Sequence, residues 1–101
     1  MSPLTEKILA WFDVGGLKRP DFWHAMGFAE TERAEALEVI FSREGGWVRN
    51  HPENKPEWDR EAFGKELGQA VMMIVMAGIA EGIDPLESLD AWLGKKIASA
   101  K

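Results

Sequence analysis

The chain has 101 residues, 46% of them hydrophobic, and this length and composition predict a single folded domain over residues 1–101. Its formal net charge of −5 argues against binding to a nucleic-acid polymer, which requires clustered Lys and Arg. The chain contains no cysteine, so disulfides and thiolate metal sites are excluded.

Helix formers such as Leu, Ala, Met and Glu are common, and β-branched residues never alternate with polar ones, as they would in a half-buried strand. We therefore expect an all-α fold of four helices. The longest apolar run, Ala70 to Ala80, is shorter than the about 20 residues that span a bilayer, and the first residues lack the pattern of a signal peptide. These features predict a cytoplasmic protein without a membrane segment.

The first helix is predicted to start after Ser2, an N-cap residue, with Pro3 at its first position, and to end at Gly15. Three apolar residues follow at helical spacing: Leu4, Ile8 and Trp11. A short helical turn is expected over residues 21–26, ended by Gly27.

The second long helix is predicted over residues 29–43, and residues 45–59, with two prolines and no periodicity, are predicted to form a long surface loop. The expected buried stripe of this helix is Ala29, Ala36, Val39 and either Ile40 or Phe41.

The third helix is predicted from about residue 60 to residue 81, closed by Gly82. Its expected buried stripe is Phe63, Leu67, Val71 or Ala70, and Ile74. The fourth helix should begin at Asp84 as N-cap, with Pro85 and Glu87 in the pattern of a capping box, and run to about residue 99.

Glutamates lie on two of the predicted helices at positions where they could face one another. Glu32 and Glu35 lie on one helix face, where like charges repel, and Glu66 lies one turn before Gln69 on the apolar third helix. Antiparallel packing of these helices would bring Glu32, Glu35 and Glu66 together. The face is then either a solvated acidic surface balanced by residues such as Arg33, or a site for a hard divalent cation.

Two segments resemble the motifs of the MazG-like nucleotide pyrophosphohydrolases. The stretch "TERAEALEVI" is similar to the family's EExxE helix, with Thr31, Glu32 and Glu35 on the motif positions. The stretch "ELGQAVMMIVMAGIAEGIDPLESLDAWLGKKI" is similar to the family's ExxD helix and the last helix after it, with Glu66 and Gln69 on the motif positions. The opening "ILAWFDVGGL" is also similar to that of small members. Thr31 stands where the family has Glu, and Gln69 where it has Asp.

The resemblance implies a four-helix MazG-like bundle that holds Mg²⁺ or Mn²⁺ through Glu32, Glu35 and Glu66, with Gln69 as a weaker ligand. It also implies hydrolysis of a nucleoside triphosphate to a monophosphate and pyrophosphate. Glu35 or Glu32 would then accept the proton of the attacking water.

Lys95 and Lys96 either contact phosphate from the last helix or lie in solvent at its C-terminal end, where the helix dipole favours cations. The resemblance implies a homodimer or homotetramer. Two other functions stay open: a catalytically weakened relative that binds nucleotide or metal, and a helical interaction protein without a nucleotide ligand.

Overall fold

A computed structural model of the chain describes residues 1–43 and 60–100, apart from the side chains of residues 42 and 43. Four helices span these ranges: α1 (Pro3–Val14), α2 (Phe22–Arg43), α3 (Arg60–Ala80) and α4 (Pro85–Ala100). The described ranges contain no strand, so the all-α prediction is confirmed. The loop predicted over residues 45–59 lies outside the described part of the chain.

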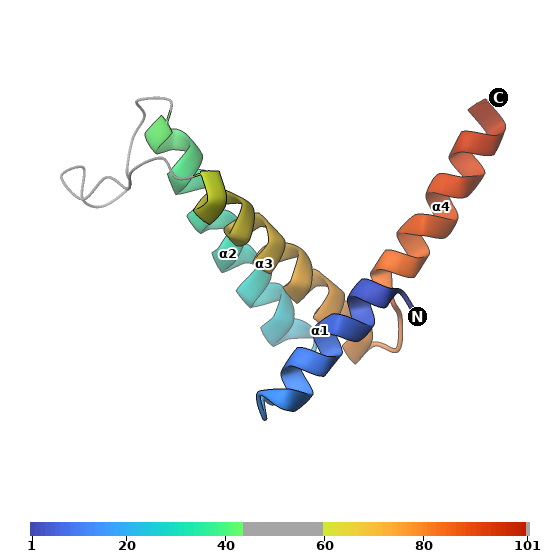
Figure 1. The fold of residues 1–101 in the computed structure, drawn as a ribbon, viewed down its shortest axis with the longest axis horizontal. Helices are drawn as coiled ribbons and strands as arrows, with labels where there is room; N and C mark the ends of the chain where they lie inside the picture. The colour runs from blue at the N-terminus through green and yellow to red at the C-terminus, as the bar shows by residue number, and fades with distance from the viewer. Residues whose placement is uncertain (44–59, 101) are drawn as a thin grey trace.

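The helices form an open V (Figure 1). Consecutive helices α2 and α3 lie side by side in opposite directions and make one arm, α1 crosses near their lower end, and α4 forms the other arm. The radius of gyration is 16.5 Å, whereas about 13 Å is typical of a compact chain of 100 residues. None of the residues of α4 is buried.

Helix α2 is continuous, so the predicted break at Gly27 is wrong. A glycine ends a helix by adopting a left-handed backbone with positive φ, and among the described glycines only Gly16 and Gly82 do so. The helix begins one residue after Asp21, whose Oδ1 accepts a hydrogen bond from the backbone N–H of His24 at 2.8 Å. That side chain is an N-cap that was not predicted from the sequence.

The core lies where α1 meets α2 and α3. The alanines predicted to be buried on α2, Ala29 and Ala36, are buried, and Ala25 is fully buried beside them. Their small side chains let α3 approach closely. The buried residues of this cluster are Ile8, Phe12, Ala25, Ala29, Met73, Val75, Met76 and Ala77.

The predicted stripe of α3 is buried at Ala70, which is 9% exposed, but not at three other predicted positions. Leu67, Val71 and Ile74 are 44–46% exposed, whereas Val75 and Met76 are 1% exposed. Because α3 is apolar on nearly every side, its periodicity could not select a face, and the contact with the alanines of α2 selects it instead. The helix is also long and apolar enough to cross a membrane by length and composition, a test that a core helix passes too.

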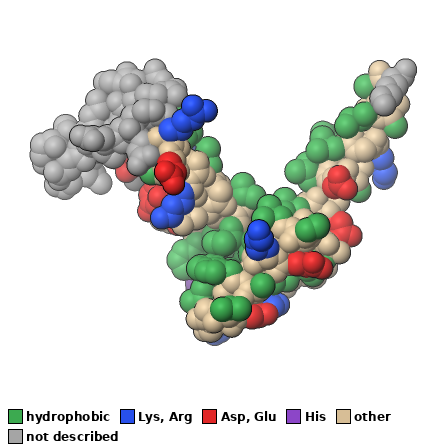
Figure 2. Space-filling model, in the orientation of Figure 1, with side chains coloured by type: hydrophobic (Ala, Val, Ile, Leu, Met, Phe, Trp, Pro, Cys, Tyr) green, Lys and Arg blue, Asp and Glu red, His purple; other side chains and the backbone are tan. Residues whose placement is uncertain are grey.

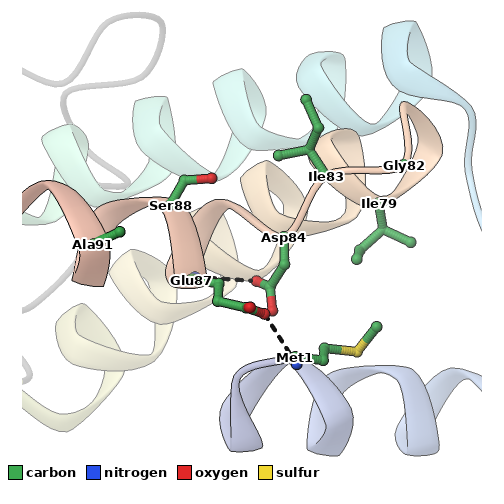
Figure 3. Close-up of a pocket in the computed structure, with 8 residues that line it drawn as sticks. All are labelled: Met1, Ile79, Gly82, Ile83, Asp84, Glu87, Ser88 and Ala91. Atoms are coloured by element: carbon green, nitrogen blue, oxygen red, sulfur yellow. Dashed lines mark hydrogen bonds and ion pairs between the residues drawn. The ribbon is translucent and has the colours of Figure 1, made fainter.

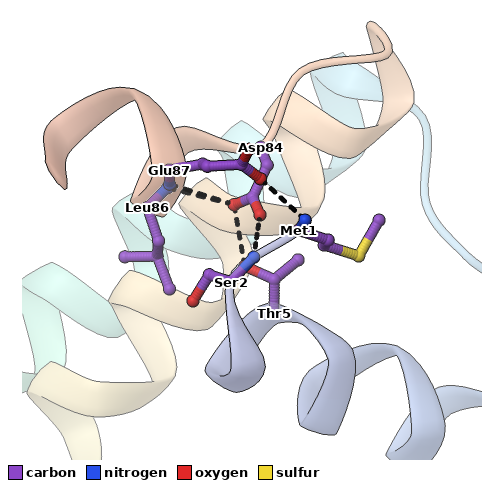
Figure 4. A network of polar contacts seen from close by, with 6 residues as sticks. All are labelled: Met1, Ser2, Thr5, Asp84, Leu86 and Glu87. Carbon is purple, nitrogen blue, oxygen red and sulfur yellow. Dashed lines mark hydrogen bonds and ion pairs between the residues drawn. The ribbon is translucent and has the colours of Figure 1, made fainter. Parts of the chain in front are cut away.

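A polar junction ties the start of α1 to the start of α4 (Figure 4). Asp84 accepts hydrogen bonds from the backbone N–H of Ser2 at 2.7 Å and from the hydroxyl of Thr5 at 2.8 Å. Asp84 also caps α4 through the N–H of Leu86 at 3.1 Å, as predicted, while Ser2 makes no side-chain cap of its own. Partial burial acts to raise the pKa of Asp84, but these hydrogen bonds outweigh it and lower the pKa.

The angle between α3 and α4 depends on Gly78. A Cβ built at Gly78 would collide with Cγ of Pro85 and lie 2.6 Å from its Cδ. The turn is closed by the N–H of Ile83, which donates to the carbonyl of Gly78 at 2.9 Å, and by Gly82 with φ 76°. The direction of α4 is therefore set by close packing at its base.

We expect Gly78→Ala to destabilise the protein by about 1–3 kcal/mol, since the rigid Pro85 ring must move to accommodate the new methyl group. Thermal unfolding followed by circular dichroism measures this as a lower Tm. The matched control is Gly68→Ala on the same helix, where a Cβ meets nothing within 4 Å. The control should raise the Tm, because alanine favours helix over glycine by about 1 kcal/mol. Equal Tm changes in both variants would contradict the proposed packing.

Candidate metal centre

Three carboxylates from two helices converge on the arm formed by α2 and α3. Glu32 and Glu35 lie one turn apart on α2, Glu66 faces them from α3, and one oxygen of each lies within 4.8 Å of the other two. Glu32 and Glu66 are half-buried and Glu35 is exposed. The antiparallel packing thus brings together the three glutamates that were predicted from the sequence to converge.

Two of these side chains have oxygens that lack a hydrogen-bond donor. The Oε2 atoms of Glu32 and Glu66 are buried, and no donor from the described residues reaches either of them. A buried carboxylate oxygen without a partner is costly, and more so when it faces another carboxylate. A proton held between the carboxylates would relieve this cost.

The pKa values of Glu32 and Glu35 are raised by this crowding of carboxylates. The pKa of Glu32 rises from 4.5 to about 7, because its protonated form hydrogen-bonds Glu66, because burial penalises its charge, and because Glu35 and Glu66 are negative. The pKa of Glu35 also rises, chiefly through a hydrogen bond with Glu66 and through partial burial. The site is therefore short of positive charge at neutral pH.

The metal-free protein should lose stability as the pH rises. The folded chain holds the Glu32 proton more tightly than the unfolded chain, so this proton stabilises the fold fully below about pH 4.5, and the stabilisation disappears as the pH rises through about 7. The expected loss is on the order of 1 kcal/mol after solvent screening. Thermal unfolding in a chelator between about pH 5 and 8 measures it. The same pH slope in Glu32→Gln would assign the effect to other groups.

The donor set fits a hard divalent cation. Mg²⁺ and Mn²⁺ prefer carboxylate oxygens and retain several waters, so three converging carboxylates are a suitable ligand set. A cation between Glu32, Glu35 and Glu66 would give both buried Oε2 atoms a partner and would remove the need for a shared proton.

Two residues, Thr31 and Gln69, depart from the motifs that the chain resembles, and they make different contacts. The hydroxyl of Thr31 donates to the carbonyl of Gly27 at 3.2 Å, so it is occupied by its own helix. Arg33, which could balance the charge of the acidic face, forms an ion pair with Glu30 at 3.0 Å. Gln69 lies on α3 one turn beyond Glu66 and lines the same cavity as Glu32.

That cavity, which we call the aromatic pocket, has a volume of about 410 Å³ and lies between α1, α2 and α3. Its lining includes Trp11, Lys18, Phe28, Glu32, Gln69 and Met72. Neither Lys18 nor Phe28 was predicted to lie at a site. Phe28 lies one turn before Glu32 on α2, so their proximity follows from helical spacing, whereas Lys18 lies just after α1 and depends on the way α1 crosses the other two helices. One early signal for the part that α1 plays was the similarity of "ILAWFDVGGL" to the start of small MazG-like proteins.

Lys95 and Lys96 lie on the other arm. Helix α4 points away from α2 and α3 (Figure 1), and the Lys96 Nζ lies 5.8 Å from the centre of the Trp92 ring. The structure therefore does not bring these two lysines to the carboxylates of the same chain.

A larger hollow of about 690 Å³ lies at the junction of α3 and α4 (Figure 3). Its acidic residues are engaged within the chain: Glu87 pairs with the amino group of Met1 at 3.0 Å, and Asp84 belongs to the junction described above. Its lining includes none of the three converging glutamates.

Comparisons of the chain with protein-family models, curated proteins and solved structures found no match.

Proposed function

We propose that this protein is a metal-dependent nucleoside triphosphate pyrophosphohydrolase, which converts a (d)NTP and water to a (d)NMP and pyrophosphate. The main support is the convergence of Glu32, Glu35 and Glu66, with two buried oxygens that lack a donor. The similarity of the two helices to MazG-like motifs supports the same reaction from the sequence. The aromatic pocket beside the carboxylates offers room for the rest of a nucleotide.

Each carboxylate has a role in this proposal. Glu32, Glu35 and Glu66 would hold Mg²⁺ or Mn²⁺, with Gln69 able to offer only a neutral amide oxygen. When bound, the ion would supply positive charge that offsets phosphate charge and would make water easier to deprotonate. The water oxygen bonds to the α-phosphorus, the bond to the bridging oxygen breaks, and pyrophosphate leaves. Glu35 or Glu32 takes the proton of the water.

We also propose a cytoplasmic homodimer or homotetramer. The support is α4, a helix without a buried residue, whose large apolar side chains are 42–56% exposed. These side chains are Leu89, Trp92, Leu93 and Ile97. We call them the α4 stripe. Packing of this stripe against further copies would complete a helical bundle, and it is the route by which Lys95 and Lys96 could approach phosphate.

The direct test is pyrophosphate release from each NTP and dNTP, with Mg²⁺ or Mn²⁺. We expect turnover of at least one nucleotide that stops in a chelator. The proposal fails if the wild-type protein releases no pyrophosphate under any of these conditions. Thermal stabilisation by neither metal nor nucleotide would instead favour the helical interaction protein.

A second function is favoured by Thr31 and Gln69, which remove two carboxylates from the motifs that the chain resembles. In this alternative the protein binds nucleotide and metal without turning over. The variant Gln69→Asp separates the two, since it restores an anionic ligand one turn from Glu66. An inert wild type and an active Gln69→Asp would establish the binding protein.

A further inference from the structure

The lining of the aromatic pocket suits a flat ring. Two of its apolar residues are buried, with Phe12 5% and Met73 8% exposed. Trp11 and Phe28, on α1 and α2, line the same pocket and remain 53% and 52% exposed. Large aromatic side chains that stay half-exposed at a pocket have free faces, and such faces favour stacking with another aromatic ring.

Gln69 is a polar group at this apolar pocket that can both donate and accept hydrogen bonds. Its amide offers two N–H donors and one oxygen acceptor, whereas a carboxylate at the same position would only accept. The edge of a nucleobase carries donors and acceptors side by side, and a Gln amide can pair with two of them at once. The neutral residue at position 69 therefore suits a base edge better than it suits a cation.

We infer that the aromatic pocket binds the nucleobase of the substrate and that Gln69 recognises the edge of that base instead of completing the metal site. This inference rests on the proposed function, because that function supplies the nucleotide. Glu32 lines the pocket and belongs to the carboxylate cluster, so a base held there has its phosphates beside Glu32, Glu35 and Glu66. Lys18, also at the pocket, contributes positive charge on the same side.

The test measures binding without metal, so that it does not depend on turnover. Nucleosides and nucleoside monophosphates of each base are titrated into the full chain in a chelator, by saturation-transfer NMR and calorimetry. We expect weak binding with a preference for one base. The apolar variant Gln69→Met should weaken binding of the preferred base by about tenfold and flatten the preference. Gln69→Glu, which keeps an acceptor and loses both donors, should shift the preference toward bases that present donors.

Substitution of a tryptophan that lines the pocket and of one that lies away from it gives a matched pair of variants. Trp11→Ala should weaken binding of every base, while Trp23→Ala, which removes a 79% exposed tryptophan from the outside of α2, should leave it unchanged. Circular dichroism and thermal unfolding check that each variant folds. A Phe28→Ala variant gives a second measurement should Trp11→Ala fail to fold.

Several outcomes overturn the inference, and they differ from failure of the proposed function. Unchanged base preference in both Gln69 variants, combined with weaker Mg²⁺ or Mn²⁺ binding, would return Gln69 to the metal site while hydrolysis stands. Absence of any nucleoside or monophosphate binding, with a change of assembly mass in Trp11→Ala, would show that a second copy covers the pocket. Nucleoside binding without pyrophosphate release would refute the enzyme and leave the base site in place.

Discussion

Glu66→Gln is expected to lower pyrophosphate release by at least about 100-fold and to abolish the rise in Tm that Mg²⁺ or Mn²⁺ produces. Glu66 is the carboxylate that α3 contributes to the cluster, so its loss leaves carboxylates from one helix only. The amide keeps the size of the side chain and removes its charge. A steady-state assay and metal titrations followed by thermal unfolding measure both effects.

The same variant should be more stable than the wild type when no metal is present. The new amide removes one of three facing negative charges and supplies an N–H donor within reach of Glu32, whose buried Oε2 lacks one. Gain of metal-free stability together with loss of activity separates a metal ligand from a residue needed only for folding. The control is Glu61→Gln, an exposed glutamate in the first turn of the same helix. Activity retained in Glu66→Gln would refute the three-carboxylate site.

Leu93→Asp is expected to dissociate the protein into single chains. Leu93 lies in the α4 stripe, and a 16-residue helix with no buried residue is marginal in isolation. Hydrophobic side chains gather along the edge of α4 that is turned toward the α2 and α3 arm (Figure 2). In a symmetric contact the substitution removes this leucine from both copies, and burial of each leucine contributes about 1.5–3 kcal/mol to association. We therefore expect the dissociation constant to rise by about 100-fold or more.

Sedimentation velocity over a range of protein concentrations measures this change. The matched control is Ala98→Asp, which adds the same charge to an exposed position away from the α4 stripe and should leave the mass unchanged. A wild-type protein that stays monomeric at every concentration would contradict the proposed assembly. An unchanged mass in Leu93→Asp would place the contact elsewhere.

Most helix ends could be predicted from residues close to them in the sequence. Asp84 before Pro85 and the glycine at 82 act within a few residues of themselves, so the junction of α3 and α4 was predictable. The helix end predicted at Gly27 was wrong, because this glycine does not adopt the left-handed backbone with which glycines end helices. The convergence of Glu32, Glu35 and Glu66 followed from helical spacing together with antiparallel packing.

The remaining features depend on contacts between distant residues. Which face of α3 is buried is decided by the alanines of α2, and no periodicity within α3 carries that information. The bond that ties α1 to the start of α4 joins Thr5 and Asp84, residues 79 positions apart. The aromatic pocket needs α1 to cross the other helices at one angle, so its lining could not be assembled from the sequence.

Helix α1 connects two parts of the molecule that have been described separately. Near one end, Ser2 and Thr5 are bonded to Asp84 at the base of α4, and near the other end Trp11 lines the aromatic pocket. A helix of 12 residues is a stiff rod about 18 Å long, so it transmits a displacement with little bending. The contacts at the two ends of α1 therefore fix the position of Trp11 relative to the base of α4.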